Sequence, residues 1–330
     1  MQRKNKKKKK IKNGYRIIIL FSLIICIVFF LKHKNTANDS LEKNEIVTGM
    51  SVTMIGGTNM KEQGNMNSCG YIIKSVNGQL IIVDGGRDED SECVLKYINE
   101  LGNGIVDHWY ITHPHGDHVG ALCTLIENND IVIENLYYSF NDVDWYRQYD
   151  TRGFASEERM INLLDSEKIK NKVSCEKGQI IRMDNIDCEI IRIANPEITK
   201  SDNGNDSSMV FKMNDLNAEK SMIFLGDAYN YASIELLKEP EKLKANAVQM
   251  AHHGQNGVTK EVYEAIKPEI CFFNAPEWLY NNDNGKGYNS GEWQSVIVRE
   301  WVKELGAQSL VAFEGDVTVV FKSDGYEIKR

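Results

Sequence analysis

The feature that most constrains the fold of this chain is a group of three histidines and one aspartate within six residues. His113, His115, Asp117 and His118 directly follow residues 107–111, whose aromatic and β-branched side chains predict a strand. Imidazoles and carboxylates at this density suit a divalent metal better than a buried core, where each histidine needs its own hydrogen-bond partner. Three individually satisfied core histidines in one turn are the weaker alternative. The run predicts a metal centre at the end of a strand.

Two later turns carry the same types of ligand. Asp227 follows a strand predicted over residues 221–225, and His252 and His253 follow one predicted over residues 247–250. Strand-end turns are where α/β folds place their sites. We therefore expect these turns to belong to the same centre, although Asp227 taken alone is equally well explained as the cap of the following helix.

Short β-rich runs alternate with helical runs from residue 51 to residue 330, and no stretch between them has the composition of a linker. The hydrophobic content of 42% is enough for a sizeable core. The seven cysteines include no C-x-x-C pair, so neither a disulfide framework nor a structural zinc site is indicated. Residues 51–330 are predicted to be one α/β domain. Helices are predicted over residues 92–101, 120–127, 156–164, 232–238, 260–266 and 291–305.

The N-terminal segment predicts a membrane anchor. Residues 17–31 are apolar or nearly so and follow a polylysine run, and as a helix they would span about 22 Å. We expect residues 15–31 to be an uncleaved transmembrane helix, with residues 1–14 as a basic cytoplasmic tail and residues 32–50 as a linker. The domain would then lie outside the cell. Secretion after signal cleavage is the alternative, but the following residues offer a poor cleavage site.

The charge distribution bears on which partners the domain can bind. Residues 1–34 carry eleven basic residues and no acid, which leaves the rest of the chain at −19 within a total of −8. A domain this acidic repels polyanions, so nucleic acid is a disfavoured partner. A small-molecule or cell-wall phosphoester remains compatible. We expect its charge to be met by the metals and by Lys61, Arg147 or Arg152.

These residues carry a family resemblance. The His113-x-His115-x-Asp117-His118 run resembles the signature of the metallo-β-lactamase superfamily, and Asp84-Gly85-Gly86 resembles its upstream strand end. The downstream motifs resemble, in order, those of the extracellular hydrolase domain of ComEC-type competence proteins: Asn205-x-Ser207-Ser208, Gly226-Asp227, His252-His253-Gly254 and Gly315-x-Val317-Thr318. The spacing from Asp227 to the histidine pair also resembles bacterial phosphorylcholine esterases. The resemblance covers residues 51–330 and is weaker between about 138 and 200.

The resemblance implies a four-layer αββα sandwich with the metals between the edges of two sheets. It also implies roles for individual residues. His113, His115 and His253 would hold one metal, Asp117 and His118 would hold a second, and Asp227 would bridge them. Asp84 would orient the metal-binding turn through hydrogen bonds, and His252 would face the substrate or support the ligands, with a swap between His252 and His253 left open. Asp117, Asp84 and His252 are thus the predicted catalytic residues.

The predicted cofactor is one or two divalent ions, with zinc expected and manganese or iron open. Where ComEC-type domains carry a further histidine, this chain has Asn289, which puts the second ion in doubt. We expect a membrane-anchored, outward-facing hydrolase that cleaves phosphoester bonds with a metal-bound hydroxide. The alternatives are a metal-retaining binding or sensor ectodomain and a hydrolase of β-lactams or cyclic esters. One hydrophobic segment is too few for a transport pore.

Overall fold

The computed structural model describes residues 46–57, 60, 67–128, 131–200 and 203–330. Within that part, residues 47–330 form one compact unit. The predicted tail and anchor, and most of the predicted linker, lie outside the described residues. Among the residues that are described, no helix combines the length and the apolar character needed to cross a membrane.

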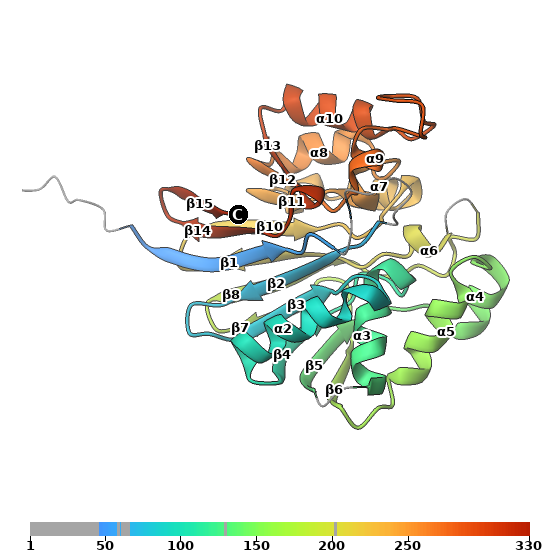
Figure 1. Cartoon of the computed structure of the whole chain (residues 1–330), viewed down its shortest axis with the longest axis vertical. Coiled ribbons are helices and arrows are strands. Elements are labelled where there is room, and N and C mark those ends of the chain that lie inside the picture. Colours follow the sequence, from blue (N-terminus) through green and yellow to red (C-terminus); the bar gives the residue numbers. More distant parts are fainter. Residues whose placement is uncertain (1–45, 58–59, 61–66, 129–130, 201–202) are drawn as a thin grey trace, which may run out of the picture. The chain divides into compact units, whose positions relative to one another are not determined.

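Two β-sheets form the centre of the unit (Figure 1). The first sheet contains eight strands and the second contains seven. In spatial order, the first consists of β15 (Gly325–Lys329), β14 (Val317–Lys322), β1 (Thr48–Met54), β2 (Gly70–Lys74), β3 (Leu80–Asp84), β4 (Ile105–Tyr110), β5 (Val132–Tyr138) and β6 (Ile169–Ser174). The second consists of β13 (Gln308–Val311), β12 (Ile270–Phe273), β11 (Ala247–Gln249), β10 (Lys220–Phe224), β9 (Val210–Asp215), β8 (Ile186–Arg192) and β7 (Ile180–Met183).

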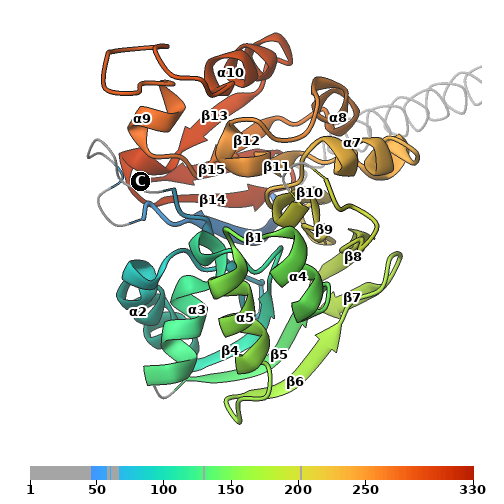
Figure 2. The same cartoon turned by 90° about the vertical axis from the view of Figure 1, so that its right-hand side faces the viewer.

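Helices cover the outer faces of both sheets. In Figures 1 and 2 the helices between residues 91 and 163 gather at the lower end of the view, and those between 230 and 304 gather at the upper end. The former are α2 (Ser91–Gly102), α3 (Gly116–Asn128), α4 (Val143–Tyr149) and α5 (Phe154–Leu163); the latter are α7 (Asn230–Leu236), α8 (Lys260–Ile266), α9 (Glu277–Tyr280) and α10 (Ser295–Glu304). The short elements are α6 (Asn203–Asp206), η1 (Asp88–Asp90), η2 (Pro240–Lys242), η3 (Ala251–Gly254) and η4 (Ala312–Glu314).

Alternation of side chains along the strands separates three apolar layers. On β3, Ile81 and Val83 face the core between the two sheets, whereas Leu80 and Ile82 face the core beneath α2, α3 and α5. A third core lies between the second sheet and helices α7, α8 and α10. Because successive strand residues point to opposite faces, a strand buried on both sides is apolar throughout. The predicted two-sheet α/β sandwich is therefore confirmed.

Several boundaries differ from those the sequence predicted. Strand β1 begins at Thr48, so the first sheet includes the end of the segment predicted as a linker. Helix α3 begins at Gly116 and not at residue 120, which places two of the predicted ligands in its first turn. Strand β6 was not predicted, because only Ile169 of its six residues is buried and the others show no apolar alternation.

Candidate functional site

The predicted ligands lie where parallel strands of both sheets end. Strands β3 to β6 are parallel to one another, and so are β10 to β13. Parallel strands present their carboxyl ends at one edge, which is where α/β sheets hold their sites. Asp84 ends β3, and residues 112–118 run from the end of β4 into the first turn of α3. Asp227 follows β10, and His252 and His253 lie in η3 directly after β11.

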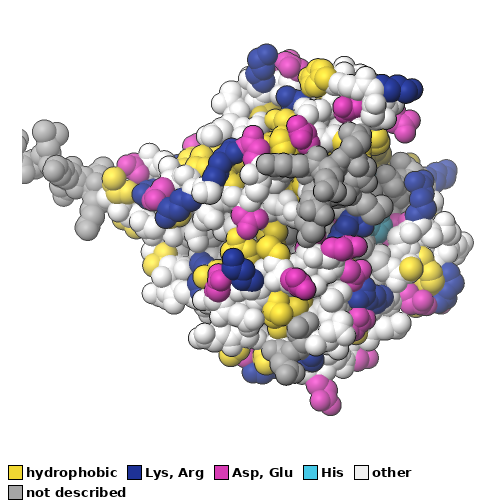
Figure 3. Space-filling model, in the orientation of Figure 1, with side chains coloured by type: hydrophobic (Ala, Val, Ile, Leu, Met, Phe, Trp, Pro, Cys, Tyr) yellow, Lys and Arg dark blue, Asp and Glu magenta, His cyan; other side chains and the backbone are white. Residues whose placement is uncertain are grey.

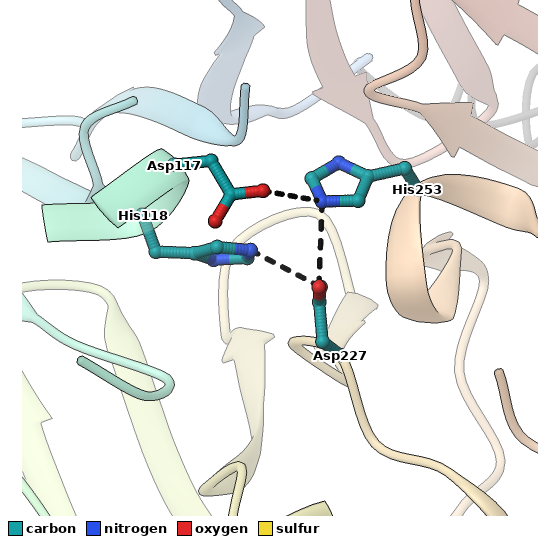
Figure 4. A group of neighbouring side chains, drawn as sticks. All are labelled: Asp117, His118, Asp227 and His253. Carbon is teal, nitrogen blue, oxygen red and sulfur yellow. Dashed lines mark ion pairs between the residues drawn. The ribbon is translucent and has the colours of Figure 1, made fainter. Parts of the chain in front are cut away.

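Four of the predicted residues converge on one point. Figure 4 shows Asp117 and His118 from the first turn of α3 pointing toward Asp227 and His253 from the second half of the chain. His118 Nε2 is 3.1 Å from Asp227 Oδ1. His253 Nε2 is 3.2 Å from Asp117 Oδ2 and 3.3 Å from Asp227 Oδ2. One ligand atom of each residue lies within 4.8 Å of all the others, so the group could hold a metal ion.

The polar atoms at this point lack the hydrogen bonds that burial normally demands. Buried side-chain atoms that make no hydrogen bond in the described part of the chain include His113 Nε2, His118 Nε2, His253 Nε2 and Asp227 Oδ1. Leaving such a group unsatisfied costs about 1–3 kcal/mol each, so several in one place call for an explanation. Imidazole nitrogens and carboxylate oxygens are the donors that zinc and similar ions bind. The residues present fit a divalent cation.

The other nitrogen of each of these imidazoles is occupied. His118 Nδ1 is 2.8 Å from Asp84 Oδ2, and His253 Nδ1 donates to the carbonyl oxygen of Asn274 at 2.9 Å. His113 Nδ1 lies 3.2 Å from the hydroxyl of Thr112. A hydrogen bond at one ring nitrogen fixes which nitrogen is left for a metal. These partners turn all three Nε2 atoms toward the centre.

Asp84 holds the turn that carries the ligands. Its Oδ1 accepts the backbone N–H of Thr112 at 2.8 Å, and its Oδ2 accepts the hydroxyl of the same residue at 2.8 Å. Asp84 is buried and has a φ of 58°, a left-handed conformation that is uncommon outside glycine. The carboxylate therefore links the end of β3 to both Thr112 and His118. The orienting role that the resemblance implied for Asp84 stays a prediction.

His115 lies apart from the four-residue group. Its Nε2 is 2.8 Å from Asp150 Oδ2 and 3.4 Å from Glu157 Oε1. The rings of His113 and His115 are nonetheless neighbours, with centroids 4.6 Å apart. The structure thus groups His253 with Asp117 and not with His115, whereas the resemblance placed His253 on the ion of His113 and His115. The assignment of ligands to two separate ions remains a prediction.

His252 and His253 occupy a strained turn. Both have positive φ, 51° and 58°. This backbone conformation costs energy in residues other than glycine, so it persists where the surrounding structure holds it in place, as it does at many functional sites. The turn sends the His253 side chain inward and leaves His252 partly accessible. His252 Nδ1 donates to the carbonyl of Asn256 at 2.9 Å, and its Nε2 lies 3.3 Å from Asn205 Nδ2 and 3.8 Å from Asp227 Oδ2.

The electrostatics of the group favour added positive charge. Burial on its own lowers the pKa of His253, but the negative charges of Asp227 and Asp117 outweigh burial and raise the pKa to about 9. Burial raises the pKa of Asp117 and Asp227, yet the neighbouring histidines hold both pKa values below their usual range. His113 differs, because burial and the charges of His118 and His115 lower its pKa well below normal. Ionised carboxylates beside a neutral His113 are suited to a cation.

Other residues that the sequence singled out lie elsewhere. Asn289 is exposed, and its Oδ1 accepts from Asn282 Nδ2 at 2.7 Å. Arg147 is paired with Asp144 and Glu158 on the surface. Lys61 lies outside the described residues, and Arg152 is exposed. None of these four is shown beside the ligands in the described part of the chain.

Three charged residues near the ligands were not predicted from the sequence. Arg87 Nη2 lies 3.7 Å from Asp117 Oδ2, and its Nε donates to the carbonyl of Asn67 at 2.7 Å. Its position directly after Asp84-Gly85-Gly86 is a signal that could have identified it. Asp150 and Glu157, which contact His115, fall in the segment where the resemblance is weak, and no local motif marks them.

One family model matches part of the chain. The family model described as "Metallo-beta-lactamase superfamily" matches residues 64–136, the segment that contains Asp84 and the histidine run. A comparison with curated proteins gives no match.

A solved structure with a TM-score above 0.5 shows the same fold. The metallo-beta-lactamase fold protein YhfI from Bacillus subtilis is 13% identical, with a TM-score of 0.51 over 83% of this chain and 99% of that one. Unliganded yeast PDE1 is 11% identical, with a TM-score of 0.48 over 83% and 99% of the two chains. A diphosphatase from the PhnP family is 10% identical, with a TM-score of 0.46 over 83% and 98%. The described part of the chain thus shares the fold of YhfI, and residues 64–136 match the family model.

Proposed function

We propose that this chain carries a metallo-β-lactamase superfamily domain and is a metal-dependent hydrolase that cleaves phosphoester bonds. The observation that carries the proposal is the convergence of buried nitrogen and oxygen atoms without hydrogen bonds, drawn from strand ends of both sheets. Such atoms are costly in an empty core and favourable around a divalent ion. The fold and the His and Asp clusters suggest the ion, and zinc suits this donor set, with manganese and iron as further candidates.

The chain's own residues would hold the ion and place the substrate. His113, His118 and His253 present Nε2, and Asp117 and Asp227 present carboxylate oxygens. A bound divalent ion lowers the pKa of its water toward 7 and polarises the oxygen of the bond to be cleaved. His252 keeps a proton on Nδ1 for Asn256, so its partly accessible Nε2 is the nitrogen that can exchange a proton with a substrate.

Charge near the ligands supports an anionic substrate of limited size. The Arg87 guanidinium lies beside Asp117 and is about a quarter exposed, so it can meet a phosphoryl oxygen close to the ion. On the face drawn in Figure 3, Lys and Arg side chains are scattered among Asp and Glu and form no continuous basic stripe. Cell-wall phosphodiesters, phosphocholine-like groups and small nucleotides fit this charge better than long nucleic acid.

The test combines metal content and turnover on one sample. Purified full-length protein would be analysed for metal per chain and assayed with bis-p-nitrophenyl phosphate and with a chromogenic β-lactam. Bound metal with phosphodiester turnover is the expected result. Turnover of the β-lactam alone would favour lactam hydrolysis, and bound metal without turnover of either would favour a binding or sensor domain. No bound metal after dialysis against zinc would contradict the proposal.

We further propose that residues 15–31 anchor the domain at the outer face of a membrane. The proposal rests on the apolar run and on the basic residues before it.

A further inference from the structure

His115 is hydrogen-bonded through the opposite ring nitrogen from the other three imidazoles in the centre. His113, His118 and His253 have Nδ1 occupied and Nε2 without a hydrogen bond. His115 has its Nε2 bound, 2.8 Å from Asp150 Oδ2 and 3.4 Å from Glu157 Oε1. Since a neutral imidazole has one donor and one acceptor nitrogen, a donor bond at Nε2 leaves Nδ1 as the atom that can bind an ion.

Asp150 is placed so that both of its oxygens receive donors. It is the C-cap residue that directly follows α4. Its Oδ1 accepts the backbone N–H of Gly153 at 3.2 Å, and its Oδ2 accepts the Nε2–H of His115. Glu157, in the following helix α5, is fully buried behind this pair. Helices α4 and α5 thus supply two carboxyl groups to one histidine. These helices belong to the segment in which the family resemblance is weak.

The backbone closes tightly around this hydrogen bond. A Cβ added to Gly204 would lie 1.7 Å from Asp150 Oδ2 and 2.4 Å from His115 Nε2. A Cβ added to Gly153 would lie 2.6 Å from the same nitrogen. Contacts this close leave the Nε2 side of the ring without room for a coordinated ion and its water. The cluster of His115, Asp150 and Glu157 is therefore better explained as a support for the imidazole than as a separate metal site.

We propose that Asp150 is a positioning residue of the metal centre, which accepts the Nε2–H of His115 and so directs Nδ1 of that ring to the ion. Glu157 encloses the pair and limits rotation of the ring. The inference rests on the proposed metal-dependent function. It gives helices α4 and α5 a part in the centre, although neither helix contributes a ligand.

Asp150→Asn tests this role with little change in volume. An aspartate offers one oxygen to each of its two donors, whereas an asparagine offers one oxygen and one NH2 group, so it can satisfy either Gly153 or His115. Loss of a hydrogen-bonding partner behind a metal-bound histidine typically weakens metal binding by about 10- to 100-fold. We expect a loss of this size for one ion in D150N, and at least as large a loss in Asp150→Ala.

The measurements are zinc affinity by chelator competition and the visible spectrum of the cobalt-substituted protein, both on the full chain. The matched control is Asp144→Asn, which removes an exposed carboxylate from the same helix, where it pairs with Arg147. The control should keep wild-type affinity and spectrum. A changed cobalt spectrum in D150N would show that the ligand geometry has moved, which a role in stability alone would not produce. Thermal unfolding of each metal-free variant identifies any that fails to fold. If D150A fails to fold, the metal binding of D150N alone tests the inference.

Three outcomes would overturn the inference. Wild-type zinc affinity and cobalt spectrum in D150N would do so, and so would lowered stability with unchanged metal binding. A metal equivalent that is lost in Glu157→Gln while the other sites stay intact would show that the cluster is itself a cation site. Failure of the wild-type protein to bind metal would instead contradict the proposed function, and the inference with it.

Discussion

At the scale of single residues, Asp227 is the side chain on which the centre most depends. Its carboxylate lies within 3.1 to 3.8 Å of ring nitrogens from His118, His253 and His252. It is buried, and its backbone N–H donates to the hydroxyl of Ser208 at 3.0 Å. The side chain therefore lies at the meeting point of three imidazoles and is almost completely buried.

Asp227→Asn is predicted to remove at least one bound metal equivalent. Changing a residue behind the ligands already costs about 10- to 100-fold, so we expect turnover to fall by at least about 100-fold when a ligand itself changes. Elemental analysis and the phosphodiester assay measure the two effects. Asp324→Asn, an exposed carboxylate between β14 and β15, serves as the control. Equal metal content and turnover in both variants would contradict the assignment of Asp227.

Metal binding is predicted to release protons at neutral pH. The pKa of His253 in the metal-free protein is raised to about 9, so this imidazole is protonated at pH 7, whereas an ion binds only the neutral ring. The apparent affinity should therefore rise as the pH increases from 6 toward 9. Calorimetry in buffers of different ionisation enthalpy counts the protons released. Release of no proton at pH 7 would show that the ion does not displace a proton from His253.

At the scale of secondary-structure elements, α7 depends on a carboxylate from a distant turn. Asp206 in α6 is buried and accepts the backbone N–H groups of Tyr229, Tyr231 and Ala232 at 2.9 to 3.1 Å. These groups belong to the start of α7, where a helix has no internal acceptors. One side chain thus fixes the helix that directly follows Asp227.

Asp206→Ala is predicted to lower the free energy of unfolding by roughly 1–3 kcal/mol, because three N–H groups lose their acceptor. Urea denaturation measures the change. Glu241→Ala, an exposed position in η2, should stay within about 0.5 kcal/mol of the wild type. If D206A were no less stable than E241A, the carboxylate would not be supporting α7.

The elements also show what the sequence could and could not predict. The strands before Asp227 and His253 were predicted because runs of buried apolar residues mark them on both faces. Helix α8 was predicted with its observed bounds, Lys260–Ile266. Strands β6 and β15 were missed because few of their residues are fully buried. Their hydrogen bonds to a neighbouring strand define them. The contact between His115 and Asp150 was missed because it joins two segments whose relation only the fold determines.

At the scale of the whole molecule, the acidic domain and the basic N-terminal run predict opposite locations for the two ends of the chain. Protease treatment of intact cells is expected to remove the domain, while residues 1–14 remain protected inside. The same treatment of permeabilised cells is the control, because it should cleave both parts. A domain protected in intact cells and cleaved only after permeabilisation would contradict the proposed topology.

Chelation is predicted to destabilise the whole domain. A ligand that binds only the native state stabilises it by about 2.7 kcal/mol when its concentration is 100 times the dissociation constant. The midpoint of thermal unfolding should therefore fall on adding a chelator and recover with zinc. An unchanged midpoint would mean that the ion is not bound under those conditions.

The separation of the ligands along the sequence has a consequence for synthesis. Asp117 and His118 leave the ribosome early, whereas Asp227 and His253 leave it much later, after most of the second sheet has been made. A nascent chain that has folded only its first half therefore presents an incomplete set of donors. The four donors of the centre come together only when the two halves join, so binding of the proposed metal would mark the completion of the fold.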